Sequence, residues 1–90
     1  MTEKLRNEVN NLGLNVFNAP DYEKFIKLLD NQSYNELRLM IDERVSYLEV
    51  IAELKQNSSI LKVQLSCCTR LEDYIMDAYI ETLNLKSVEY

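Results

Sequence analysis

Two long segments of the chain, residues 34–56 and 60–84, contain neither glycine nor proline and are separated only by Asn57-Ser58-Ser59. In each segment the apolar side chains recur with a helical period and occupy about half of the helical wheel. A helix that packs against a single neighbour needs an apolar stripe only about 100° wide. We therefore predict two long helices that form an antiparallel hairpin and present further apolar surface to other helices.

The beginnings of both long helices carry residues that are typical of N-caps. Ser33 opens an S-x-x-E capping box, in which the serine and glutamate side chains each bind a backbone N–H of the first turn. Ser58 or Ser59 supplies the equivalent hydroxyl before the second long segment. These signals place the helices over residues 33–56 and 59–84.

Residues 1–18 are predicted to form an arm or a short helix. Thr2 suits an N-cap, and Gly13 stands where a left-handed C-terminal cap would end a first helix. The alternating residues 14–17 then suggest an extended arm whose apolar side chains lie on the helices.

A short helix is predicted over residues 19–30. Asn18 is a favourable N-cap, and Pro20 is tolerated in a first helical turn. At about 1.5 Å per residue each long helix spans about 35 Å, so the short helix covers about a third of the hairpin. The remaining apolar face predicts a homodimer in which two hairpins complete a four-helix core.

Composition favours a single all-α domain over residues 1–90. The chain has one glycine and one proline, whereas an all-β fold needs many such residues in its turns. The net charge is −5 and the basic residues are scattered, which disfavours binding to nucleic acid. No stretch approaches the roughly 20 apolar residues of a membrane span, and the N-terminus lacks the apolar core of a secretory signal. These features predict a cytoplasmic protein that does not bind membranes.

Nothing in the sequence predicts catalysis, a metal site or a cofactor. The chain has no histidine, and its two cysteines are adjacent, as Cys67 and Cys68. Neighbouring side chains on a helix point about 100° apart, so these thiols cannot chelate one ion together. We interpret them as small core residues.

Arg44 falls in the middle of the apolar arc of the first long helix. One interpretation is an arginine that binds an anion or a partner's carboxylate in a dry groove. The other is an arginine whose stem packs apolarly while its guanidinium reaches water. Glu72 intrudes in the same way on the second long helix, so an Arg44–Glu72 pair is a third arrangement.

The string LRLMID, residues 37–42, resembles the L-R-x-x-I-D pattern in the first helix of the helical chorismate mutases. This resemblance implies a small all-α dimeric enzyme whose basic side chains bind the substrate's two carboxylates. Arg38 would match the first arginine and Lys55 a later basic position. The further lysine of the family pattern falls on Ser66, where the sequence departs from it.

The sequence as a whole predicts a small non-catalytic regulator or inhibitor of another protein, of the phage or bacterial accessory-factor type, that acts through helix-face contacts. An assembly chaperone or structural subunit is one alternative, and a chorismate-mutase-like enzyme is the other. Leu39 and Val50 extend the apolar surface of the first long helix beyond its main arc. The residues predicted to contact a partner or a second copy are Met40, Arg44, Tyr47, Ile51, Leu54, Tyr74 and Tyr79.

Overall fold

The computed structural model describes the backbone of residues 2–55 and 58–88 and the side chains of that part as far as residue 84. Within these residues the chain forms four helices and no strand, so the prediction of an all-α fold is confirmed. The helices are α1 (Glu3–Val16), α2 (Ala19–Asp30), α3 (Tyr34–Leu54) and α4 (Ser59–Val88). The predicted helical residue Gln56 and the predicted linker residue Asn57 lie outside the described residues.

Three of the four predicted N-caps form. The side-chain oxygens of Thr2, Asn18 and Ser58 each accept the backbone N–H three residues further on, at 3.2, 3.0 and 3.4 Å. Ser33 precedes α3 but makes no side-chain cap hydrogen bond, so the predicted capping box with Glu36 is wrong. The backbone of Ser33 is tied instead to α2, because its N–H donates to a carbonyl of that helix at 2.9 Å.

Gly13 does not end α1, and the predicted extended arm over residues 14–17 is also wrong. The helix continues to Val16, and Gly13 has no positive φ angle. A Cβ atom on Gly13 would lie 2.8 Å from Cε1 of Phe25 in α2. The position therefore holds a glycine because a buried ring of α2 packs against the α1 backbone, which is a tertiary requirement rather than a local one.

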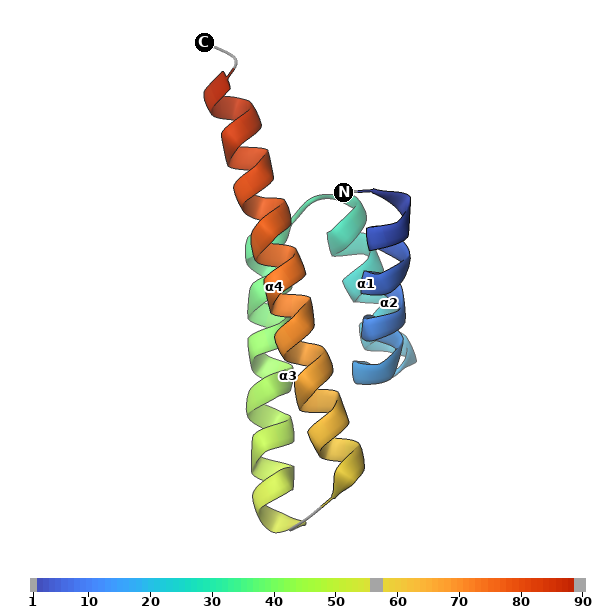
Figure 1. The fold of residues 1–90 in the computed structure, drawn as a ribbon. Helices are drawn as coiled ribbons and strands as arrows, with labels where there is room; N and C mark the ends of the chain where they lie inside the picture. The colour runs from blue at the N-terminus through green and yellow to red at the C-terminus, as the bar shows by residue number, and fades with distance from the viewer. Residues whose placement is uncertain (1, 56–57, 89–90) are drawn as a thin grey trace.

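α3 and α4 run side by side, and α1 and α2 form a shorter pair that lies against them (Figure 1). α1 packs mainly on α4, and α2 packs on α3. The molecule measures 53 × 20 × 20 Å. α1 and α2 are about 21 and 18 Å long, compared with about 32 Å for α3. The shorter pair therefore leaves the end of α3 and α4 near their connection uncovered, together with the C-terminal part of α4 (Figure 1).

One buried cluster holds side chains from all four helices. α1 supplies part of the cover that the sequence analysis assigned to a second copy, because that analysis did not place a helix of this length there. The largest fully buried side chains are Val9, Val16, Phe25, Leu37, Ile41, Leu48, Cys68, Leu71 and Ile75.

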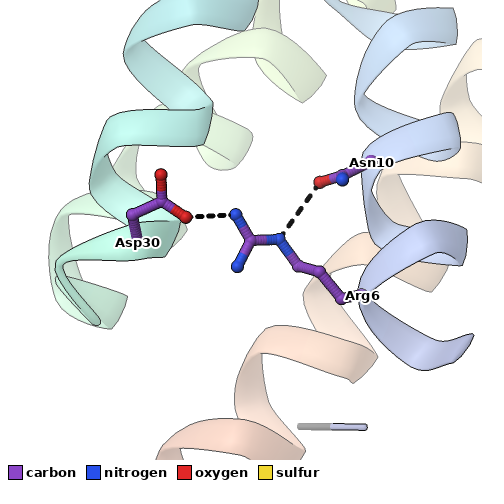
Figure 2. A network of polar contacts seen from close by, with 3 residues as sticks. All are labelled: Arg6, Asn10 and Asp30. Atoms are coloured by element: carbon purple, nitrogen blue, oxygen red, sulfur yellow. Dashed lines mark hydrogen bonds and ion pairs between the residues drawn. The ribbon is translucent and has the colours of Figure 1, made fainter. Parts of the chain in front are cut away.

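A polar contact joins the N-terminal part of α1 to the C-terminal end of α2 (Figure 2). The guanidinium of Arg6 forms an ion pair with Asp30, and its Nε donates to Oδ1 of Asn10 at 3.3 Å. Ion pairs on a surface contribute little stability, about 0–1 kcal/mol. The contact therefore adds little to the stability of the fold.

Candidate protein-binding face

Four large apolar side chains lie exposed along one side of α3. Leu39, Tyr47, Val50 and Leu54 are 63, 55, 57 and 79% exposed. At 3.6 residues per turn, their spacing places them within about 80° of the helix circumference. We call these four residues the α3 stripe. Apolar side chains aligned in this way are typical of a surface that receives another helix.

Two adjoining hollows lie between α2 and α3, beside this stripe. They measure about 220 and 200 Å³ and share Lys24, Met40 and Glu43 as lining residues. Tyr47 lines the first hollow and Leu39 the second, so the hollows open directly onto the α3 stripe. We call the two hollows together the α2–α3 groove.

Arg44 caps the C-terminal end of α1 rather than pairing with a carboxylate. Its Nε donates to the carbonyl oxygen of Val16, the last residue of α1, at 2.8 Å. The last turn of α1 has no basic residue of its own, so Arg44 supplies the positive charge that favours a helix C-terminus. The guanidinium carbon lies 5.1 Å from the ring centroid of Tyr47. Among the described residues, no ion pair joins Arg44 to Glu72.

A second side chain from another helix also binds the end of α1. Nε2 of Gln64 in α4 donates to the carbonyl oxygen of Asn15 at 3.1 Å. The sequence pattern does not indicate this role of Gln64, and none of the three interpretations of Arg44 has a helix carbonyl as its partner. Both roles depend on where α1 ends and which helices pass beside that end, and neither is written in the local sequence.

Five of the seven predicted interface residues belong to α3 and differ in exposure. Tyr47 and Leu54 are exposed in the α3 stripe, while Met40, Arg44 and Ile51 are half-buried beside it. Leu39 and Val50 are not among the predicted interface residues. The signal that identifies them was present, because both extend the apolar surface of this helix around its circumference.

The two predicted interface residues of α4 have partners inside the chain. The hydroxyl of Tyr74 donates to Oε2 of Glu8 at 2.8 Å, which ties α4 to α1. The ring of Tyr79 meets the ring of Tyr34 edge-on, with 6.4 Å between centroids. Contact of either tyrosine with a partner stays a prediction.

A separate hollow of about 210 Å³ lies between α3 and α4, where Arg38 stands among Asp42, Glu72 and Asp73. Burial raises the pKa of Glu72, and a hydrogen bond and the negative charge of Asp42 raise it further. Lys55 follows α3 some 17 residues beyond Arg38, which is about 25 Å along a helix. Arg38 and Lys55 therefore do not meet at one site within a single chain, and the enzyme alternative stays a prediction.

Cys67 and Cys68 are buried and not joined by a disulfide. Burial raises the pKa of the Cys68 thiol to about 11, and a thiol that stays protonated at neutral pH is a poor nucleophile. Among the side chains of residues 2–55 and 58–84, no cluster could hold a metal ion. No helix in the described part of the chain is both long and apolar enough to cross a membrane.

Comparisons with protein-family models, with curated protein sequences and with solved structures find no match for this chain. The arrangement of its own side chains is therefore the basis on which a function is proposed.

Proposed function

We propose that this protein is a small non-catalytic regulator or inhibitor that binds another protein, and that a helix of the partner lies along the α3 stripe. The observation that carries the proposal is the alignment of Leu39, Tyr47, Val50 and Leu54 on one exposed side of α3. Helix-in-groove recognition uses apolar anchors with this kind of spacing. The α2–α3 groove beside the stripe receives the anchors of the partner helix.

Burial of the α3 stripe would supply the affinity. Full burial of a leucine or valine side chain contributes about 1.5–3 kcal/mol, and tyrosine is enriched among residues that dominate binding energy. Tyr47 already lies against the guanidinium of Arg44, which restricts the ring before a partner arrives. An anchor that is ordered beforehand loses less entropy on binding.

Affinity purification from the native host with Val50→Asp tests this proposal. We expect the parent chain to retain one stoichiometric protein partner and Val50→Asp to lose it, because the variant places a carboxylate in the apolar contact. Leu14→Asp in α1 is the matched control, since Leu14 is also exposed but lies outside the stripe. If both variants retained the same partner, the α3 stripe would not be the binding face.

The same purification separates a regulator from an assembly chaperone or structural subunit. A regulator gives a complex of one size, whereas a chaperone or subunit gives large complexes with several components. A partner of fixed stoichiometry therefore supports the proposal, and a ladder of large assemblies contradicts it.

We also propose that two copies of the chain associate through the first turns of α4, beside the C-terminal end of α1. Ile60 and Val63 are 72 and 59% exposed there and line a hollow beside Gln64. Light scattering at micromolar concentration should give about twice 10.6 kDa for the parent and 10.6 kDa for Val63→Asp. A parent chain of 10.6 kDa would contradict the dimer. Loss of the dimer in Val50→Asp would place the second copy on the α3 stripe instead.

A further inference from the structure

The α3 stripe has carboxylates on its own side of the helix and along one edge. The helical spacing places Glu36 and Glu43 on the same side of α3 as the stripe, and both line the α2–α3 groove. Along the edge away from α2 the helical spacing places Asp42, Glu49 and Glu53. All five side chains are exposed, and among the described residues none of them forms an ion pair with a lysine or arginine.

Few positive charges offset these carboxylates. α3 contains two basic residues, Arg38 and Arg44. Arg44 donates to the end of α1, and Arg38 stands in the acidic hollow between α3 and α4. Lys24 of α2 lines both hollows of the groove, and Arg44 lines one of them. The carboxylates within the stripe and along its edge away from α2 therefore outnumber the basic groups beside it.

Glu43 has a special position because it lies within the stripe. It is four residues from Leu39 and four from Tyr47, so its side chain stands between two apolar anchors on the same side of the helix. An entirely apolar partner would bury this carboxylate without a counter-charge, which is unfavourable. A lysine or arginine of the partner, at the edge of its own apolar face, would give Glu43 that counter-charge.

From this geometry, and resting on the proposed function, we infer that the partner segment is a basic amphipathic helix. Its apolar face covers the α3 stripe, and lysine or arginine side chains beside that face meet Glu36 and Glu43 on the stripe's own side of α3 and Glu49 and Glu53 along the edge away from α2. The stripe is about 23 Å long, so a segment of about four helical turns spans it.

Two synthetic peptides test the inference. Each has about 18 residues, with leucine repeated at four- and three-residue intervals along one face. One carries lysine on both edges of that face, and the other carries glutamate at the same positions. Fluorescence anisotropy with the full chain should show binding of the lysine peptide that weakens as salt is added, and no binding of the glutamate peptide.

Charge reversal in the protein locates the contact. Glu43→Lys should weaken binding of the lysine peptide about tenfold, because a like charge then faces it. Glu23→Lys is the matched control, since Glu23 is exposed on α2 and does not line the groove. The control should bind as the parent does, and Val50→Asp should lose binding.

The inference would be overturned if neither peptide bound, or if both bound equally well. It would also be overturned if Glu43→Lys and Glu23→Lys weakened binding of the lysine peptide equally, or if Val50→Asp broke up a homodimer. Its failure is distinguishable from failure of the proposed function. If Val50→Asp loses the host partner but Glu43→Lys keeps it, the α3 stripe is the binding face and only the inference of a basic partner fails. If Val50→Asp keeps the host partner, the proposal that the α3 stripe is the binding face fails.

Discussion

Two contacts between helices in this protein differ in how completely they bury the side chains along them. Between α1 and α4 the apolar side chains that face each other are buried, except at the hollow beside Gln64 where α1 ends. Polar groups at the margin are paired, as Tyr74 is with Glu8 and Gln64 with Asn15. Between α2 and α3 the contact stays open as the α2–α3 groove, with Leu39 and its stripe exposed beside it.

The difference teaches that apolar content alone does not say which face of a helix is core. α3 and α4 have similar apolar patterns in the sequence, yet α4 receives a helix with matched polar contacts and α3 receives one that covers it only in part. The length of the covering helix explains part of this difference, because α2 is about 18 Å long and α3 about 32 Å. An apolar side chain that no neighbour reaches remains available for another molecule.

The largest expected effect comes from comparing an aspartate placed in the buried face of α4 with an aspartate placed in the exposed α3 stripe. Ile75→Asp puts a carboxylate at a fully buried position of α4 and should lower the free energy of unfolding by about 4 kcal/mol or more, which unfolds a chain of this size. Val50→Asp should change it by no more than about 0.5 kcal/mol, because the stripe is solvated. Urea unfolding followed by circular dichroism measures both. Similar losses of unfolding free energy in the two variants would mean that position 50 of α3 is as buried as position 75 of α4.

Arg44→Met tests the link between the two contacts. The variant keeps the apolar stem but removes the donor to the Val16 carbonyl, so we expect a loss of about 1.5 kcal/mol in unfolding free energy. Hydrogen exchange should increase at the C-terminal turn of α1 and stay unchanged in the middle of α3. Arg38→Met is the control, because Arg38 is exposed. Equal effects of the two variants would show that Arg44 does not cap α1.

Tyr74→Phe sharpens the description of the α1–α4 contact. It removes the hydroxyl that donates to Glu8 and keeps the ring, so stability should fall by about 1 kcal/mol or less. Glu8→Gln can still accept this hydrogen bond and should lose less. A double-mutant cycle on the pair measures the coupling directly, and a coupling of zero would mean that the apolar contact alone holds α1 to α4.

Glu72→Gln has the smallest expected effect and depends on pH. The pKa of Glu72 is raised by burial and by Asp42, so its ionised form disfavours the folded state at neutral pH. The variant should then be more stable than the parent at pH 7, by about 0.5 kcal/mol or less. The gap should close as the pH falls through the raised pKa towards the ordinary value of a glutamate, because the parent side chain becomes neutral too. A constant gap across that range would contradict the shift.

The elements of this fold are largely predictable from sequence because their signals are local. Thr2, Asn18 and Ser58 mark helix starts through hydrogen bonds that span only three residues. Gly13 misleads because glycine also suits a helix end, and only the ring of Phe25 explains why it stands in the middle of α1.

The candidate site was less predictable because exposure is a property of the whole fold. The periodicity of α3 identifies Tyr47 and Leu54 as apolar-face residues, but it does not say that α2 stops short of them. For the same reason the periodicity alone does not place Val50 in the interface. Arg44 stands out in the sequence as a charge on an apolar arc, and its actual partner is a carbonyl 28 residues away that no local pattern reveals.

The hydrogen bond between Tyr74 and Glu8 joins residues that are 66 positions apart, and it bears on how the chain folds as it is made. Synthesis proceeds from the N-terminus at about 5–20 residues per second, so the ribosome adds the 30 residues of α4 about 2–6 s after α3 is complete. During that interval α1 has no α4 to pack against. We expect the core to close late, in a step that is limited by the arrival of α4 rather than by the formation of any single helix.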